Sequence, residues 1–143
     1  MAWGLDILGP FPTTTGGLKF LFVAIDTFTK WIEAELVTKI TSEAAIRFIL
    51  KNVITRFSVP SRIITDNGTQ FASAAFTEYC EELGTKICFA SVAHPQSNGQ
   101  VERANSLVLQ GIKKRVYDRL MAHRKAWVIE LPTVLWAIRT TAS

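Results

Sequence analysis

The run from Phe20 to Asp26 restricts the fold of this chain more than any other stretch. Its residues, FLFVAID, are apolar up to the closing aspartate and rich in aromatic and β-branched side chains. An uninterrupted run of this kind is typical of a buried strand. The segment Lys30–Val37 partly alternates between apolar and polar residues and is expected to be its hairpin partner. With the short apolar segment Trp3–Leu8, these stretches predict three adjacent antiparallel strands.

Helical periodicity follows these strands. In the segment Thr41–Phe57, apolar residues recur at helical spacing on one face, and Thr41 or Ser42 can cap its N-terminus. That face is expected to consist of Ile46, Ile49, Leu50, Val53, Ile54 and Phe57. The later elements are expected to be a strand at Arg62–Thr65, a helix at Ala72–Leu83 closed by Gly84, a strand at Lys86–Ala90, a long helix to about Met121 and a last helix at roughly Lys125–Thr140. This order predicts an α/β domain in which helices flank a mixed five-stranded sheet.

Composition places the chain among compact globular proteins. Its 143 residues are enough for one domain with a core, and 48% of them are hydrophobic, with a mean hydropathy of +0.20. Cys80 and Cys88 are too few for a disulfide framework, so we expect free thiols in an intracellular protein. No signal peptide is visible and no apolar run reaches the length of a membrane span, so no membrane partner is expected.

Two polar stretches interrupt the apolar pattern at places that suit a site. In the first, ITDNGTQF, a strand ends in Asp66 and a turn pair follows at once, which is where open α/β sheets place their sites. The second, AHPQSNGQVERAN (Ala93–Asn105), has the pattern of a loop that leads into a helix. On that helix, the spacing puts Asn98, Glu102 and Asn105 on one face.

A third acid, Asp6, lies in a strand-like apolar run near the start of the sequence. Carboxylates at strand ends and on a helix face can together hold two divalent metal ions for in-line attack at phosphorus. Oxygen ligands without sulfur or imidazole favour Mg²⁺ or Mn²⁺ over zinc. The segment Arg103–Lys125 adds seven basic residues against one acid, as a phosphate-binding surface does, although a solvated helix face explains the more distant ones equally well.

The three acids, with 35 residues between Asp66 and Glu102, resemble the catalytic core of retroviral and LTR-retrotransposon integrases. The stretches GPFP, IDTFTKWIEA, TDNGTQF and HPQSNGQVERAN most resemble the gypsy class, and the resemblance runs from about Trp3 to Thr141. It implies an RNase H-like fold. It also implies that two ions of Mg²⁺ or Mn²⁺ bind, with Asp6 and Asp66 sharing one ion and Glu102 helping to bind the second.

The resemblance further implies a reaction and partners. The domain would trim the 3′ end of element DNA and then join that end to target DNA. Gln96 and Asn98 match loop positions that contact the DNA end, Asn105 matches a position that steadies the site, and Arg103 and Lys113 would bind backbone phosphate. Because cores of this family usually dimerise, we expect a homodimer or higher oligomer that acts in the nucleus.

The same resemblance treats residues 1–143 as one integrase catalytic core domain. Under this resemblance we expect residues 1–143 to lack the HxxxH…CxxC zinc module that precedes the core, the basic DNA-binding domain that follows it and the last helix of the family core. We therefore expect this domain alone to be weak in concerted integration.

Three other interpretations compete with this one. A domesticated, non-catalytic DNA- or protein-binding module would be marked by the loss of an acid, and all three acids are present. An RNase H-type nuclease would carry an acid in the middle of its first helix, whereas Glu43 lies in the first turn. A cut-and-paste transposase usually has a longer acid spacing. Two further acids are expected to be structural, Asp26 as a turn cap and Glu33 on the exposed face of its strand.

Overall fold

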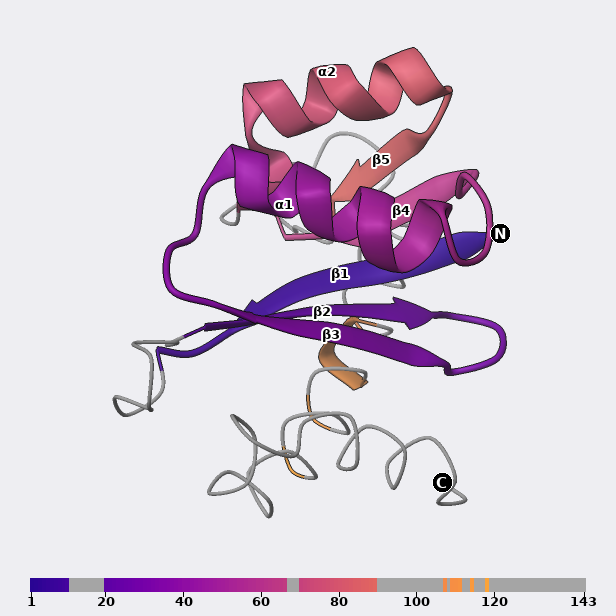
Figure 1. Ribbon diagram of the computed structural model, residues 1–143. Helices are drawn as coiled ribbons and strands as arrows, with labels where there is room; N and C mark the ends of the chain where they lie inside the picture. The colour runs from indigo at the N-terminus through magenta and orange to yellow at the C-terminus, as the bar shows by residue number, and fades with distance from the viewer. Residues whose placement is uncertain are drawn as a thin grey trace, which may run out of the picture.

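A mixed sheet of five strands, in the order β3-β2-β1-β4-β5, forms the centre of the computed structural model (Figure 1). The structure describes residues 1–10, 20–66 and 70–89, together with 107, 109–111, 114 and 118. The elements are β1 (Ala2–Leu8), β2 (Phe20–Asp26), β3 (Ile32–Val37), α1 (Ser42–Ile49), the π-helix η1 (Leu50–Ile54), β4 (Arg62–Thr65), the 3₁₀-helix η2 (Gln70–Ala72), α2 (Ala74–Leu83) and β5 (Lys86–Phe89). None of the helices in these ranges is both long and apolar enough to cross a membrane.

Strand β1 joins the two halves of the sheet. It pairs with β2 in antiparallel fashion, and β2 pairs with β3 in the same way, so the prediction of three antiparallel neighbours is confirmed. On its other side β1 runs parallel to β4, with Gly4 opposite Ile64, and β4 runs parallel to β5. The carboxyl ends of β1, β4 and β5 therefore point to the same edge of the sheet.

Helices α1 and α2 cover one face of the sheet (Figure 1). The core on this face is built from large apolar side chains of β1 and β2 and of both helices. Phe22 is its centre: its ring lies 5.6 Å from that of Phe48 and 5.4 Å from that of Phe71, measured between centroids. The buried members are Trp3, Leu5, Phe22, Ala24, Ala45, Phe48, Ile49, Val53, Ile63, Phe71, Phe76 and Cys80. Burial of each large side chain in such a core contributes about 1.5 to 3 kcal/mol.

The opposite face of the sheet is contacted by helical residues from the C-terminal third of the chain (Figure 1). Leu109 is buried there against Ile64 of β4 and Cys88 of β5. All six described residues between positions 107 and 118 are helical, as expected for the long helix. The rest of that prediction, and the last helix, lie outside the described residues.

The first predicted helix differs from the structure in its second half. After Ile49 the α-helix continues as the π-helix η1, in which the Thr55 amide donates to the Leu50 carbonyl at 3.0 Å. Two members of the predicted apolar face, Leu50 and Phe57, are not buried, since each is 44% exposed. Leu50 stands about 100° around the helix axis from Ile49. The i→i+5 hydrogen bonding of the π-helix then rotates the later side chains away from the α-helical pattern.

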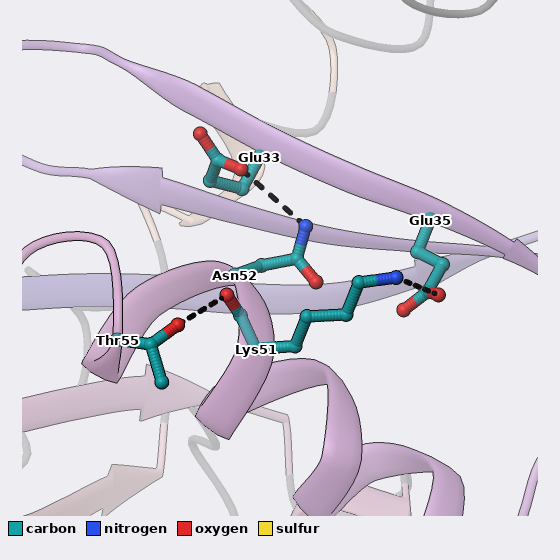
Figure 2. Close-up of polar contacts among 5 residues, drawn as sticks. All are labelled: Glu33, Glu35, Lys51, Asn52 and Thr55. Carbon is teal, nitrogen blue, oxygen red and sulfur yellow. Dashed lines mark hydrogen bonds and ion pairs between the residues drawn. The ribbon is translucent and has the colours of Figure 1, made fainter.

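Glu33 corrects another prediction, because it is only 4% exposed rather than on a solvent face. It pairs in register with Ala24, which belongs to the core under α1 and η1. Its carboxylate accepts from the Trp31 indole at 2.6 Å and from the Asn52 amide at 3.4 Å (Figure 2), and it lies 3.3 Å from Arg56 Nε. Alternation correctly separates the two faces of β3, but here the polar face turns towards a helix rather than water.

Asp26 has the structural role predicted for it. Its Oδ1 accepts hydrogen bonds from the backbone amides of Phe28 at 2.9 Å and Thr29 at 3.4 Å, which closes the turn between β2 and β3. Lys30, in the same turn, adopts a positive φ of 67°. Lys30 therefore belongs to the turn, and β3 begins at Ile32, two residues later than predicted.

Candidate active site

Asp6 lies on the face of β1 that α1 and α2 do not cover. Successive side chains of a strand point to opposite faces. Trp3 and Leu5 belong to the core under the helices, so Gly4 and Asp6 face the other way. Asp6 is only 4% exposed and pairs in register with Val23 of β2. A carboxylate in this position is sheltered from bulk water, which strengthens its interaction with any cation that reaches it.

Asp66 directly follows β4 and is partly exposed. Gly4 of β1 is the register partner of Ile64 of β4, and both strands run in the same direction. If this register continued for two more residues, it would bring Asp6 level with Asp66, which directly follows β4. Because neighbouring strands lie about 4.8 Å apart, that arrangement would allow both carboxylates to reach one cation. Two carboxylates this close repel each other, and a divalent cation offsets that repulsion.

The same face of the sheet receives the C-terminal helical residues. Ile64, which contacts Leu109, lies two residues before Asp66 and so shares its side of the strand. The helical segment that contains Leu109 is therefore attached to β4 two residues before Asp66. This contact links the stretch that holds Asp66 to the part of the sequence in which the third predicted acid lies.

The other predicted site residues fall outside the described part of the chain. They are Gln96, Asn98, Glu102, Arg103, Asn105 and Lys113. Within the described ranges, no group of three or more His, Cys, Asp or Glu residues is arranged to hold a metal ion. Of the three predicted acids the structure describes only Asp6 and Asp66, and the roles of all three stay predictions.

One polar cluster beside this site was not anticipated from the sequence. Ser42 Oγ lies 3.2 Å from Gln70 Oε1 and 3.0 Å from Ser73 Oγ. Gln70 belongs to the stretch TDNGTQF that drew attention to Asp66, but nothing in the local sequence indicates that Ser42 is its partner.

A family model for the integrase core domain matches residues 2–95 of the chain. The chain belongs to the integrase core domain family. The retroviral and LTR-element resemblance is therefore confirmed, whereas the gypsy class stays a prediction. The Gag-Pol polyprotein of avian reticuloendotheliosis virus is 35% identical over 129 residues, which cover 90% of this chain. The chain spans 11% of the length of that relative.

Two solved structures place the integrase core among known folds. The catalytic core domain of HTLV-2 integrase, determined in complex with magnesium in a dimeric form, is 29% identical, with a TM-score of 0.54. That match covers 62% of this chain and 58% of the HTLV-2 chain. The catalytic core domain of BIV integrase is 21% identical and shows the same fold, with a TM-score of 0.67 over 99% of this chain and 86% of that one. The predicted RNase H-like fold is confirmed.

Proposed function

We propose that this integrase core is a metal-dependent polynucleotidyl transferase that trims DNA 3′ ends and joins them to target DNA. The observation that carries the proposal is the parallel pairing of β1 with β4, in which Gly4 lies opposite Ile64, two residues before Asp6 and Asp66 respectively. Two carboxylates on neighbouring strands supply hard oxygen ligands of the kind that Mg²⁺ and Mn²⁺ prefer.

The proposed site binds two such ions. Asp6 and Asp66 would hold one ion between them, and Glu102 would help to hold the second. Bound divalent ions lower the pKa of an attacking water or 3′-hydroxyl and stabilise the leaving oxygen. The magnesium in the HTLV-2 structure supports divalent-metal use in a relative of this chain. In this chain the protein's part is to hold the carboxylates in place, one of them buried and one at the rim.

The Leu109 contact supports the assignment of Glu102. Glu102 precedes Leu109 by seven residues, which is close to two turns of a helix, or about 10 Å along its axis. Residues seven apart in one helix point to nearly the same side. Since Leu109 faces β4 and β5, a continuous helix would direct Glu102 to the same face of the sheet as Leu109.

DNA is the proposed partner, both as element ends and as target. The amides Gln96 and Asn98 would contact the DNA end, Asn105 would steady the site, and Arg103 and Lys113 would bind phosphate. Such contacts predict affinity that falls as salt rises. We also propose that the domain works in the nucleus as a homodimer or higher oligomer. The dimeric form of the HTLV-2 core supports oligomerisation.

The test is Mn²⁺-dependent cleavage or disintegration of a branched DNA substrate. Wild type is compared with Asp66→Asn, Glu102→Gln and the matched control Asp26→Asn. Asp26 also ends a strand, but it pairs with Trp3 at the far end of β1 from Asp6. An asparagine there keeps the oxygen that caps the turn.

Loss of activity in the first two variants, with activity retained in the control, supports the proposal. Inactive wild type that still binds Mn²⁺ by calorimetry would indicate an intact site that lacks its flanking domains. Inactive wild type that binds no metal would overturn the proposal and favour the domesticated module. An RNase H-type nuclease would instead cleave an RNA–DNA hybrid, and Glu43, which is exposed in the first turn of α1, is the acid to test for it.

A further inference from the structure

Ser42, Gln70 and Ser73 form a small hydrogen-bonded cluster that joins three elements. Ser42 is the first residue of α1, Gln70 is the first residue of η2, and Ser73 is the N-cap of α2. The Ser42 hydroxyl lies 3.2 Å from Gln70 Oε1 and 3.0 Å from Ser73 Oγ. The cluster therefore connects the chain that follows Asp66 to a helix from a distant part of the sequence.

One arrangement of the hydroxyl protons satisfies every contact in the cluster. A serine hydroxyl has one proton to donate and can accept through its lone pairs. Both contacts of Ser42 are satisfied at once if it donates to Gln70 Oε1 and accepts from Ser73. Ser73 Oγ also accepts from the Phe76 amide at 3.3 Å, which caps α2. In this arrangement each serine hydroxyl donates one hydrogen bond and accepts one, and a satisfied network of this kind restricts the positions of its members.

Phe71 fixes the same segment from the other side. It is fully buried, and its ring lies 5.3 Å from that of Phe76 and 5.4 Å from that of Phe22. The helix η2 is therefore held by the core through Phe71 and by α1 through Gln70. Three residues, 67–69, separate Gln70 from Asp66, and Asp66 follows the buried Thr65 of β4. Both ends of the stretch that carries Asp66 are consequently anchored.

We propose that Ser42, Gln70 and Ser73 act as a clamp that positions Asp66 for metal binding, an inference that rests on the proposed function. They are positioning residues, because none of them is a predicted metal ligand and Gln70 follows Asp66 by only four residues in the sequence. Groups that orient a metal ligand affect metal affinity without touching the ion. The clamp also makes the geometry of Asp66 depend on the docking of α1, which lies across the opposite face of the sheet.

The test compares three single variants with wild type by Mn²⁺ calorimetry and thermal melting. Ser42→Ala removes the central hydroxyl, and Ser42→Thr keeps it. Ser61→Ala is the matched control, because Ser61 also donates a hydroxyl hydrogen bond, to the Met1 carbonyl at 2.8 Å, but precedes β4 at the end away from Asp66. We expect Ser42→Ala to weaken Mn²⁺ binding about tenfold, at the low end of effects seen for groups that orient metal ligands. Ser42→Thr should restore wild-type affinity, and Ser61→Ala should leave affinity unchanged.

A second variant keeps the test independent of any folding defect in the first. Gln70→Leu removes the hydrogen-bond partner of Ser42. Because either substitution alone already breaks the clamp, the double variant Ser42→Ala/Gln70→Leu should bind Mn²⁺ no more weakly than either single variant. If Ser42→Ala and Gln70→Leu bind Mn²⁺ as tightly as Ser61→Ala, the clamp is overturned and the metal site stands. If wild type binds no Mn²⁺, the proposed function fails as well, so the two failures are distinguishable.

Discussion

Leu109 packs against Ile64, two residues before Asp66, on the face of the sheet that α1 and α2 leave free. This contact attaches the C-terminal helical residues to β4. We expect Leu109→Ala to lower the free energy of unfolding by about 2 to 5 kcal/mol, as for other buried leucines. If the same helix carries Glu102 into the site, Mn²⁺ affinity should fall as well. Denaturant unfolding and calorimetry measure both quantities, and unchanged Mn²⁺ binding in a destabilised variant would separate this helix from the metal site.

Metal binding should stabilise the fold through Asp66. A ligand that binds only the folded state adds about 2.7 kcal/mol at a concentration one hundred times its dissociation constant. We therefore expect Mn²⁺ to raise the melting temperature of wild type and EDTA to reverse the increase. Asp66→Asn should show no such increase, whereas Asp26→Asn should respond as wild type does. An equal increase in both variants would place the ion elsewhere.

Glu33 should contribute more to stability than its neighbour on the same face, Glu35. Glu33 is buried and receives hydrogen bonds from Trp31 and Asn52, so Glu33→Ala removes the acceptor that these two partly buried donors share, at a cost of about 1 to 3 kcal/mol. Glu35 makes a 3.4 Å ion pair with Lys51 (Figure 2). The Lys51 side chain is 68% exposed, so Glu35→Ala should cost about 1 kcal/mol or less. Urea unfolding of the two variants tests the difference, and equal losses would contradict it.

Cys80 should make the fold less stable in alkali. Burial in the core raises the pKa of its thiol from an ordinary 9.0 to about 11. The unfolded chain therefore loses this proton first, and the stability that Cys80 provides is complete below pH 9 and declines as the pH rises towards 11, by at most about 2 to 3 kcal/mol. Burial, and secondarily the charge of Cys80, also raises the pKa of Tyr79, which acts in the same direction.

The free energy of unfolding, measured between pH 8 and 11 in wild type and Cys80→Ala, isolates the contribution of the thiol. In the variant this free energy should fall less steeply with rising pH. In native protein a thiol reagent should modify the partly exposed Cys88 first and Cys80 slowly. Equal reaction rates would contradict the burial of Cys80.

The sheet could be predicted where local pattern and local structure agree. Phe20–Asp26 and Arg62–Thr65 match the observed strands because each is an apolar run that ends in a polar turn. The π-helix after Ile49 could not be predicted, because the apolar residues that follow still fit an α-helical pattern. The burial of Glu33 was missed because alternation separates two faces without showing which of them another element covers.

The site could be predicted only in part for a similar reason. The motifs pointed to Asp6 and Asp66, but these two residues come from neighbouring strands only because β4 lies beside β1, which follows from strand order rather than from either stretch. The link between Ser42 and Gln70 joins residues 28 apart in sequence, and neither has a local signature that names the other.

The parallel pairing of β1 with β4 also determines when the site can form. The hairpin of β2 and β3 and its pairing with β1 use neighbouring segments, whereas β4 reaches β1 only after α1 and η1 have crossed the sheet. Contacts between segments distant in sequence carry a larger loop-closure cost and tend to limit the folding rate. During synthesis, a chain that has only its first three strands can form the antiparallel half of the sheet but has Asp6 alone, so the proposed metal site could form only when the sheet is complete.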